Sequence, residues 1–275
     1  MKKNLLTILL VTIMVLGALV MLYPTVSNYV NSRAQSHMVT SYTSSVKGSK
    51  DYSAEWEAAR AFNASLNAKG NCVVMTDSER AAYETLLNID GTGMMGVIEI
   101  PKINVSLPLY HGTSDSVLQR GVGHLEGTSL PTGDVGTHPV FSGHRGLPSA
   151  KLFTDLDKVE VGDRFTVSVY DQKLIYEVDQ ILVVLPEETE ALAIDPEQEL
   201  CTLVTCTPYG VNSHRMLVRG HRVQESSGAA LTSDLERIDT IVSGAAAAVP
   251  LAVLLVIWFI TSLVGKHGTT KRKER

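Results

Sequence analysis

The sequence predicts a mainly β fold, a closed or nearly closed barrel with short helices, an N-terminal helical extension and two flanking transmembrane helices. Three observations predict it. Residues 91–224 contain one short alternating apolar segment after another, separated by Gly, Pro or Asp. Residues 24–90 show helical periodicity. An uncharged apolar run lies near each end of the chain.

The first apolar run, from Asn4 to Tyr23, has about the length that a helix needs to cross a bilayer. No small-residue cleavage site follows it, so we expect residues 1–23 to form an uncleaved anchor. The second run, Ile241 to Gly265, precedes a basic tail over 266–275, and two lysines precede the first run. The positive-inside rule therefore places both termini in the cytoplasm and the residues between the spans outside it.

The helical extension over 24–90 contains two clear helices and a possible lid. The second helix begins near residue 76, where Thr76 and Glu79 fit the S/T-x-x-E capping box. The first has apolar side chains at steps of three and four residues and Gly70 as its expected C-cap; these side chains are Tyr52, Trp56, Ala59, Phe62 and Leu66.

The region 91–224 changes to a period of two. The expected strands are "MGVIEIPKI", "VSLPLYHG", "HPVFSGH", "DRFTVSVYDQKLIYEVDQILVVLP", "LCTLVTC" and "RMLVRGHRV". Only brief helical stretches are expected among them, and "SAKLFTDLDKV" is one. The small polar residues of 225–240 are typical of a linker to the second span.

Composition excludes several classes of protein. A formal charge of −5 over 275 residues gives no bulk basic charge for nucleic acid, and three cysteines are too few for a disulfide-dense scaffold. The chain has no C-x-x-C pair, and no second histidine lies at ligand spacing near its cysteines. We therefore expect no metal site.

The segment "LCTLVTCTPYGVNSHR" contains the strongest candidates for chemistry. Strand alternation turns Cys201 and Cys206 to opposite faces, since they are an odd number of residues apart. Cys206 lies where turn-forming residues end the strand, and a hairpin-like return would bring Arg215 back beside its sulfur. A cation there would favour the thiolate and could bind an oxyanion. Packing as a small hydrophobe is the structural alternative for a cysteine at a strand end.

A thiol nucleophile also needs a partner for proton transfer. His144 is the best placed histidine, because it ends an apolar strand and precedes a Gly-Pro-containing turn. The residues alone leave other candidates open, namely His111, His124, His138 and His214.

Five sequence blocks between Met95 and Val223 resemble the sortases, the cysteine transpeptidases of Gram-positive surfaces. They are "GVIEIPKINVSLPLYHGT", "GVGHLEGTSLPTG", "GTHPVFSGHRGLPSAKLFTDLDKV", "TLVTCTPYGVNSHR" and the following "MLVRG". The C-terminal span, the helical extension and the phrases "LEGTSLP" and "CTPYGVN" resemble class C, the pilin-polymerising sortases.

The resemblance implies an eight-stranded sortase barrel with Cys206 as the nucleophile, His144 as the general acid and base, and Arg215 for the oxyanion or substrate positioning. Cys206 would cleave an LPXTG-like signal between Thr and Gly, and a lysine of an acceptor pilin would take the acyl group. No metal or organic cofactor is implied. Thr205 is a further candidate, for substrate binding.

One segment departs from the class C pattern. Class C sortases commonly carry a lid with an Asp-Pro-aromatic motif, and at that place this chain has Asp77 followed by Ser78 and Glu79. Asp77 is the candidate lid residue, but it also fits the first turn of a capped helix. Cys72 offers a third possibility, a lid held by its sulfur or by the residues after it.

Two other functions remain open. The chain could be a sortase that anchors surface proteins to peptidoglycan, or a membrane-tethered binding module with an inert barrel. The expected partners of the leading hypothesis are LPXTG-bearing substrates, an acceptor pilin and the lipid bilayer, with no nucleic acid.

Overall fold

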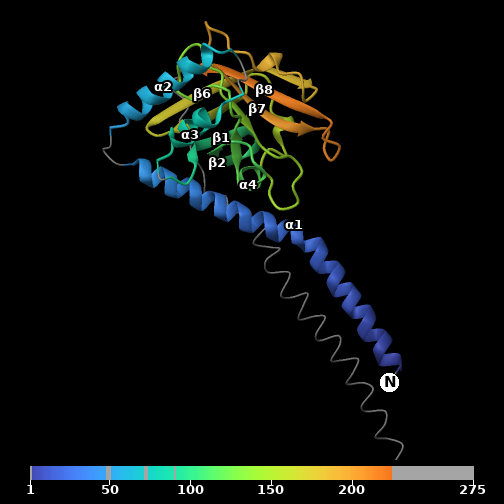
Figure 1. Cartoon of the computed structure of the whole chain (residues 1–275). Coiled ribbons are helices and arrows are strands. Elements are labelled where there is room, and N and C mark those ends of the chain that lie inside the picture. The colour runs from blue at the N-terminus through green and yellow to red at the C-terminus, as the bar shows by residue number, and fades with distance from the viewer. Residues whose placement is uncertain (1, 48–50, 71–73, 90, 225–275) are drawn as a thin grey trace, which may run out of the picture. The chain divides into compact units, whose positions relative to one another are not determined.

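The computed structural model describes residues 2–47, 51–70, 74–89 and 91–224 (Figure 1). The predicted linker, the second span over 241–265, the basic tail and Cys72 lie outside the described residues. The strands are β1 (Met94–Ile100), β2 (Val105–His111), β3 (Val122–His124), β4 (Val140–Ser142), β5 (Arg164–Val169), β6 (Gln172–Val184), β7 (Leu200–Thr207) and β8 (His214–Val223). The helices are α1 (Lys2–Val46), α2 (Ser53–Asn67), α3 (Asp77–Thr85) and α4 (Asp115–Leu118), with 3₁₀ turns η1 (Pro101–Ile103), η2 (Leu156–Lys158) and η3 (Glu190–Leu192).

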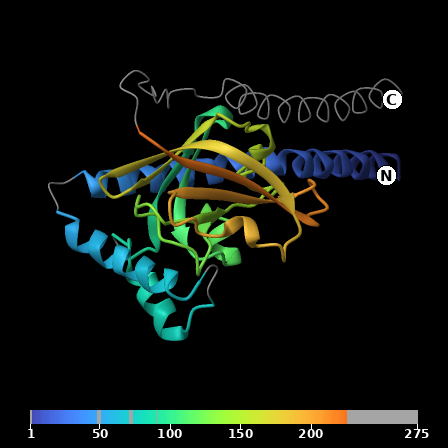
Figure 2. The same ribbon diagram turned by 90° about the horizontal axis from the view of Figure 1, so that it is seen from above.

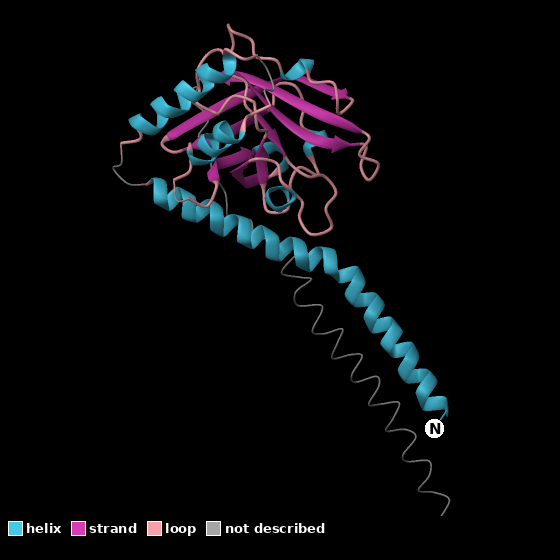
Figure 3. Cartoon of the chain, in the orientation of Figure 1, coloured by secondary structure: helices cyan, strands magenta, loops and turns pink. Residues whose placement is uncertain are grey.

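The strands close into a barrel in the order β1-β2-β3-β4-β7-β8-β6-β5, and β1 pairs with β5 to complete it (Figure 3). The predicted barrel is confirmed. The pairs β2–β3 and β4–β7 are parallel and the other pairs are antiparallel. Because β4 and β7 run in the same direction, both end at one edge of the barrel, and β8 begins at that edge.

The barrel interior holds the main hydrophobic core. Alternate residues along each strand point inward, as the period of two predicted, so each strand contributes every second side chain. The largest fully buried side chains include Phe141, Phe153, Phe165, Tyr176, Ile98, Leu109 and Leu130. Cys201 belongs to this core as well.

Helix α1 joins the first predicted span to the barrel without a break. Its segment Ile8–Val46 is the one helix of the described residues that is long and apolar enough to cross a membrane. The helix continues through Pro24 and runs beneath the barrel (Figure 1). Tyr42 fixes this end of α1, since its buried hydroxyl donates to Met95 O at 2.8 Å and accepts from Tyr170 N at 2.9 Å.

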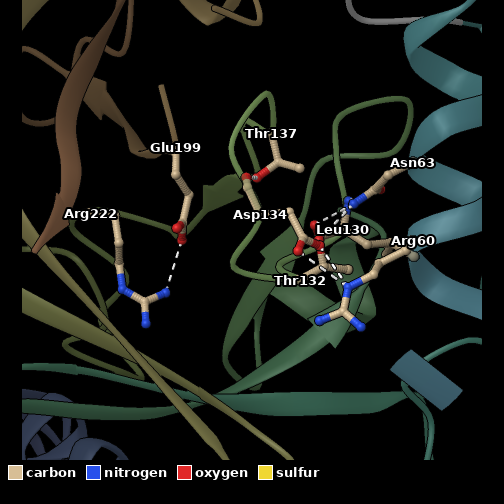
Figure 4. Close-up of polar contacts among 8 residues, drawn as sticks. All are labelled: Arg60, Asn63, Leu130, Thr132, Asp134, Thr137, Glu199 and Arg222. Atoms are coloured by element: carbon tan, nitrogen blue, oxygen red, sulfur yellow. Dashed lines mark hydrogen bonds and ion pairs between the residues drawn. The ribbon is translucent and has the colours of Figure 1, made fainter. Parts of the chain in front are cut away.

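Helices α2 and α3 form as the sequence predicted, and both halves of the capping box between Thr76 and Glu79 are present. Asn63 fastens α2 to the loop before β4, because its amide donates to Leu130 O and accepts from Leu130 N (Figure 4). Gly70 is not the C-cap of α2, since the helix ends at Asn67 and Ala68 occupies the cap.

The expected helix over "SAKLFTDLDKV" is wrong. Only the single 3₁₀ turn η2 forms there. Leu152 has a φ of 40°, which a right-handed helix does not allow, and Phe153 N donates to the distant His144 O. Tertiary contacts have replaced the local helical hydrogen bonds.

The beginning of β7 is held by a polar cluster around Glu199. The carboxylate Oε1 of this residue accepts from Tyr176 Oη at 2.9 Å. It also accepts from Arg222 Nη1 at 3.0 Å (Figure 4). Pairing with hydrogen-bond donors offsets the cost of burying the carboxylate. This cluster lies at the edge of the barrel opposite to the end of β7.

Candidate active site

Cys206 and Arg215 lie opposite each other at the edge where β4 and β7 end, and His144 follows the last residue of β4 by two residues. Cys206 in β7 is the register partner of Arg215 in β8. On the other side, Ser142 of β4 pairs with Val204, and Gly143 N donates to Val204 O at 3.0 Å. If this parallel register continued for two more residues, His144 would lie beside Cys206. The strands β4, β7 and β8 are neighbours, so we expect the three candidates at one edge of the sheet.

The two described cysteines differ as strand alternation predicted. Cys201 is completely buried in the core, and its burial raises the pKa of the thiol well above the usual value. Cys206 is partly exposed, five residues later on the opposite face and next to an exposed turn. A reactive thiol must be accessible, so only Cys206 of this pair suits a nucleophile.

Arg215 is held at its end of β8 by backbone carbonyls. Its Nη1 donates to Asn212 O and to His214 O, both at 3.1 Å. These contacts orient the guanidinium over the β7–β8 turn, while the opposite strand places Cys206 at the same register. Arg215 is thus the register partner of Cys206, and its role in stabilising negative charge beside the sulfur stays a prediction.

A buried hydrogen bond connects the residues that precede Cys206 and His144. Thr205 Oγ1 donates to Gly143 O at 2.8 Å, and the Thr205 side chain is only 1% exposed. Gly143 itself is closely packed, since a Cβ there would lie 2.6 Å from a ring carbon of Phe153. The hydroxyl of Thr205 thus donates to a backbone carbonyl of the protein itself. The expected contact of Thr205 with substrate stays a prediction.

Arg145 makes a second connection across the site, which sequence reasoning missed. Its side chain is 9% exposed, and its Nη2 lies 2.5 Å from Asp157 Oδ2. Its Nη1 donates to Thr207 Oγ1 at 3.3 Å. The Nε atom is buried without a hydrogen-bond partner among the described residues. Arg145 therefore joins the segment after His144 to the segment after Cys206. In the sequence, only its position next to His144 could have indicated this role.

His124 is a buried structural residue at the end of β3. Tyr83 Oη lies 2.9 Å from Nδ1, and Nε2 lies 2.8 Å from Ser129 O. The neutral ring satisfies both contacts when the hydroxyl donates to Nδ1 and Nε2–H donates to the carbonyl. Complete burial lowers the pKa of His124 to about 4.

The remaining histidines also have internal contacts. His138 is buried, with Nδ1 2.8 Å from Ala193 O and Nε2 2.7 Å from Thr202 Oγ1, and burial lowers its pKa. Burial likewise lowers the pKa of His111, whose ring nitrogens lie 3.0 and 2.7 Å from two backbone carbonyls. His214 contacts its neighbour Ser213. Of the five histidines considered, His144 follows β4 at the edge of the barrel where Cys206 lies, and its role as the general acid and base stays a prediction.

Asp77 is the first residue of α3 and is exposed to solvent. Helix α3 is fastened by Tyr83 to His124, and Arg80 pairs with Glu126, at the opposite end of β3 and β4 from His144. Figure 2 shows α2 and α3 grouped at the side of the barrel away from the β7–β8 turn. The lid role of Asp77 stays a prediction, and the observed environment is that of a capped helix start.

Comparison with known proteins identifies the fold. The family model described as "Sortase domain" matches residues 98–223. The crystal structure of sortase C1 from Streptococcus agalactiae is 50% identical with a TM-score of 0.67, and the match covers 69% of this chain and 100% of that one. Sortase C1 of GBS Pilus Island 1 is 40% identical with a TM-score of 0.61, covering 71% of this chain and 95% of that one.

Among curated proteins, sortase D of Bacillus subtilis strain 168 is 32% identical over 131 residues. That match covers 46% of this chain and 63% of the relative, so the chain spans under two thirds of its length. The matching family model contains all three candidate residues within its range, and the solved sortase C1 structure is matched along its whole length. The chain belongs to the sortase family.

Proposed function

We propose that the chain is a cysteine transpeptidase that cleaves an LPXTG-like sorting signal between Thr and Gly and transfers the acyl group to a pilin lysine. The observation that carries the proposal is the register pairing of Cys206 on β7 with Arg215 on β8, at the edge of the barrel where β4 ends two residues before His144. Such an arrangement supplies a nucleophile, a proton carrier and a cation at one place, which acyl transfer through a thioester requires.

The first half of the proposed reaction forms the acyl-enzyme. The Cys206 thiolate attacks the threonine carbonyl carbon, and the guanidinium of Arg215 stabilises the negative charge on the carbonyl oxygen. The C–N bond then breaks as the imidazolium of His144 gives its proton to the leaving glycine amine. The product is a thioester between threonine and Cys206, with a neutral imidazole.

The second half of the reaction releases the thioester. A neutral lysine amine attacks the same carbonyl carbon, His144 takes a proton from that amine, and the C–S bond breaks. The product is an isopeptide bond, and Cys206 leaves with the imidazolium restored. Every proton is moved by residues of this chain, and no metal or organic cofactor is required by these steps.

The surface beside Cys206 fits an apolar sorting signal. Strand alternation puts Val204 on the face of Cys206, and Leu217 on the face of Arg215. Both residues belong to a small hydrophobic cluster with partly buried members on β6 and near η3, namely Leu182, Val184 and Ala191. The leucine and proline of an LPXTG signal would bury apolar area against this cluster.

The choice of a pilin acceptor rests on similarity. One similar solved structure is named as sortase C1 of a pilus island, and the sequence carries the helical extension and second apolar run typical of class C. The competing acceptor is a peptidoglycan amine, and two curated relatives are named sortase A. A barrel without catalysis is the third possibility.

The proposal includes a membrane location. The apolar segment of α1 serves as the N-terminal anchor, and the run over 241–265 serves as the second span, so that both termini are cytoplasmic. Accessibility of a tag at each terminus in intact and in permeabilised cells tests this topology. Labelling of either tag in intact cells would contradict it.

A reconstituted reaction tests the function. The full chain is incubated with an LPXTG-containing pilin and either an acceptor pilin or a cross-bridge peptide, and the products are identified by mass spectrometry. We expect a thioester on Cys206 that only the pilin lysine converts into an isopeptide. Conversion by the cross-bridge peptide alone would favour cell-wall anchoring. Equal product with Cys206→Ala and with wild type would refute catalysis by this residue.

A further inference from the structure

The segment after His144 forms a short closed loop, Arg145–Leu152, called here the histidine loop. Phe153 N donates to His144 O at 3.1 Å, so the loop returns to the residue from which it starts. Inside it, Leu147 and Ala150 form an isolated bridge, and Gly146 N donates to Thr154 Oγ1 at 3.2 Å. Because both ends of the loop adjoin His144, a shift of the loop changes the position of this backbone.

Helix α1 holds this loop through two asparagines. Asn31 Nδ2 donates to Ser149 O at 2.7 Å, and Lys151 N donates to Asn28 Oδ1 at 2.9 Å. Asn28 and Asn31 are three residues apart and therefore lie on the same face of the helix. One acts as an acceptor and the other as a donor, so the two contacts complement both kinds of backbone group in the loop.

The same face of α1 is attached to the barrel farther along. Gln35 donates to Arg120 O at 3.1 Å, and Met38 and Val39 pack on the cluster that includes Tyr42. From Asn31 to Tyr42 the helix advances by roughly 16 Å at its usual rise. Tyr42 anchors one end of this rigid segment, and the asparagines lie at the other.

The asparagine contacts lie close to the predicted membrane surface. Asn28 follows Tyr23, the last residue of the first apolar run, by five residues. In a continuous helix this separation is about 8 Å. Among the described residues, the contacts with the histidine loop are the first side-chain hydrogen bonds from α1 to the barrel after the apolar run.

We propose that Asn28 and Asn31 are positioning residues that hold the histidine loop, so that the anchor helix α1 fixes the placement of His144 for proton transfer. This inference rests on the proposed function, since it assigns the contacts a role in that reaction. The anchor then does more than retain the enzyme at the membrane, because one face of its helix forms part of the support of the active site.

The different bonding roles of the two asparagines allow a sharp test in the full chain in lipid nanodiscs. Asn28→Asp keeps an acceptor for Lys151 N, whereas Asn31→Asp removes the donor to Ser149 O and places a carboxylate against that carbonyl. Gln35→Ala is the matched control, since it removes a contact of α1 outside the loop. The readouts are hydrogen exchange of the loop amides and kcat and KM for release of the glycine peptide from an LPXTG substrate.

We expect Asn31→Asp to speed exchange in the loop and to lower kcat by about tenfold, the loss of roughly one partly buried hydrogen bond, with little change in KM. Asn28→Asp and Gln35→Ala should match wild type in both measurements within about twofold. Asn28→Ala should resemble Asn31→Asp.

Four outcomes would overturn parts of the scheme. Unchanged loop exchange in Asn31→Asp would show that α1 does not hold the loop. Faster exchange with an unchanged kcat, or an equal effect of Gln35→Ala, would show that the contact has no positioning role. A wild-type chain that releases no peptide, while the exchange differences hold, would refute the proposed function and leave the contact between α1 and the loop intact.

Discussion

The hydrogen bond from Thr205 to Gly143 O provides the sharpest test of how the site is assembled. Replacing Thr205 with valine keeps the shape of the side chain but removes the hydroxyl. The carbonyl of Gly143 then loses a partner in a place where the Thr205 side chain is 1% exposed. Leaving a buried polar group unsatisfied costs about 1–3 kcal/mol.

The expected effect of Thr205→Val on catalysis exceeds that of an ordinary destabilising change. The bond joins the residue before Cys206 to the residue before His144, so its loss changes the separation of the two reacting groups. We expect kcat to fall by roughly tenfold or more, because displacement by about an ångström can cost a hundredfold. Thr205→Ser keeps the hydroxyl and loses one methyl, so it should retain most of kcat at a stability cost of about 1 kcal/mol.

Steady-state kinetics and thermal unfolding of the full chain, measured on wild type and both variants, distinguish the possibilities. A lower kcat in the valine variant, with KM unchanged and with recovery in the serine variant, supports a positioning role. A change in KM alone would instead support the predicted contact of Thr205 with substrate. A valine variant that melts earlier but retains the wild-type kcat would refute the positioning argument.

Three further predictions concern stability and the site. Burial lowers the folded-state pKa of His124 to about 4, so its contribution to stability is complete above the usual pKa of 6.5 and falls by about 3 kcal/mol as the pH drops from 6.5 to 4. In thermal melts over this range, His124→Gln should flatten the dependence of the melting temperature on pH. If the slope of melting temperature against pH is unchanged in this variant, His124 is not its source. Asn63→Ala removes buried hydrogen bonds and should lower the free energy of unfolding by about 1–3 kcal/mol, whereas Arg60→Ala removes a half-exposed ion pair and should lower it by less than about 1 kcal/mol. Equal losses of melting temperature in the two variants would contradict the view that Asn63 holds α2 more strongly than Arg60 does. Arg145→Ala should lower kcat by about tenfold with KM unchanged. Asp157→Asn keeps an acceptor for the guanidinium and should lower the rate of single-turnover peptide release by less. A larger loss in Asp157→Asn than in Arg145→Ala would exclude a role for Arg145 in joining the two segments of the site.

Local patterns in the sequence were enough to predict several features. The period of two predicted most of the barrel strands and the opposite orientations of Cys201 and Cys206, because side-chain direction in a strand depends on its own pleat. The capping box of α3 was predicted for the same reason, since its partners lie three residues apart. Arg215 was correctly placed near Cys206 because a single turn separates them.

Only the tertiary structure decided which distant residues share the site. The parallel pairing of β4 with β7 brings the strand that precedes His144 beside the strand of Cys206, and no local period specifies a partner strand about sixty residues away. The same holds for the continuation of α1 past the apolar run and for its contacts with the histidine loop. These contacts come from hydrogen bonds between segments more than one hundred residues apart. Residue patterns predict what each segment can present, and the fold determines what it meets.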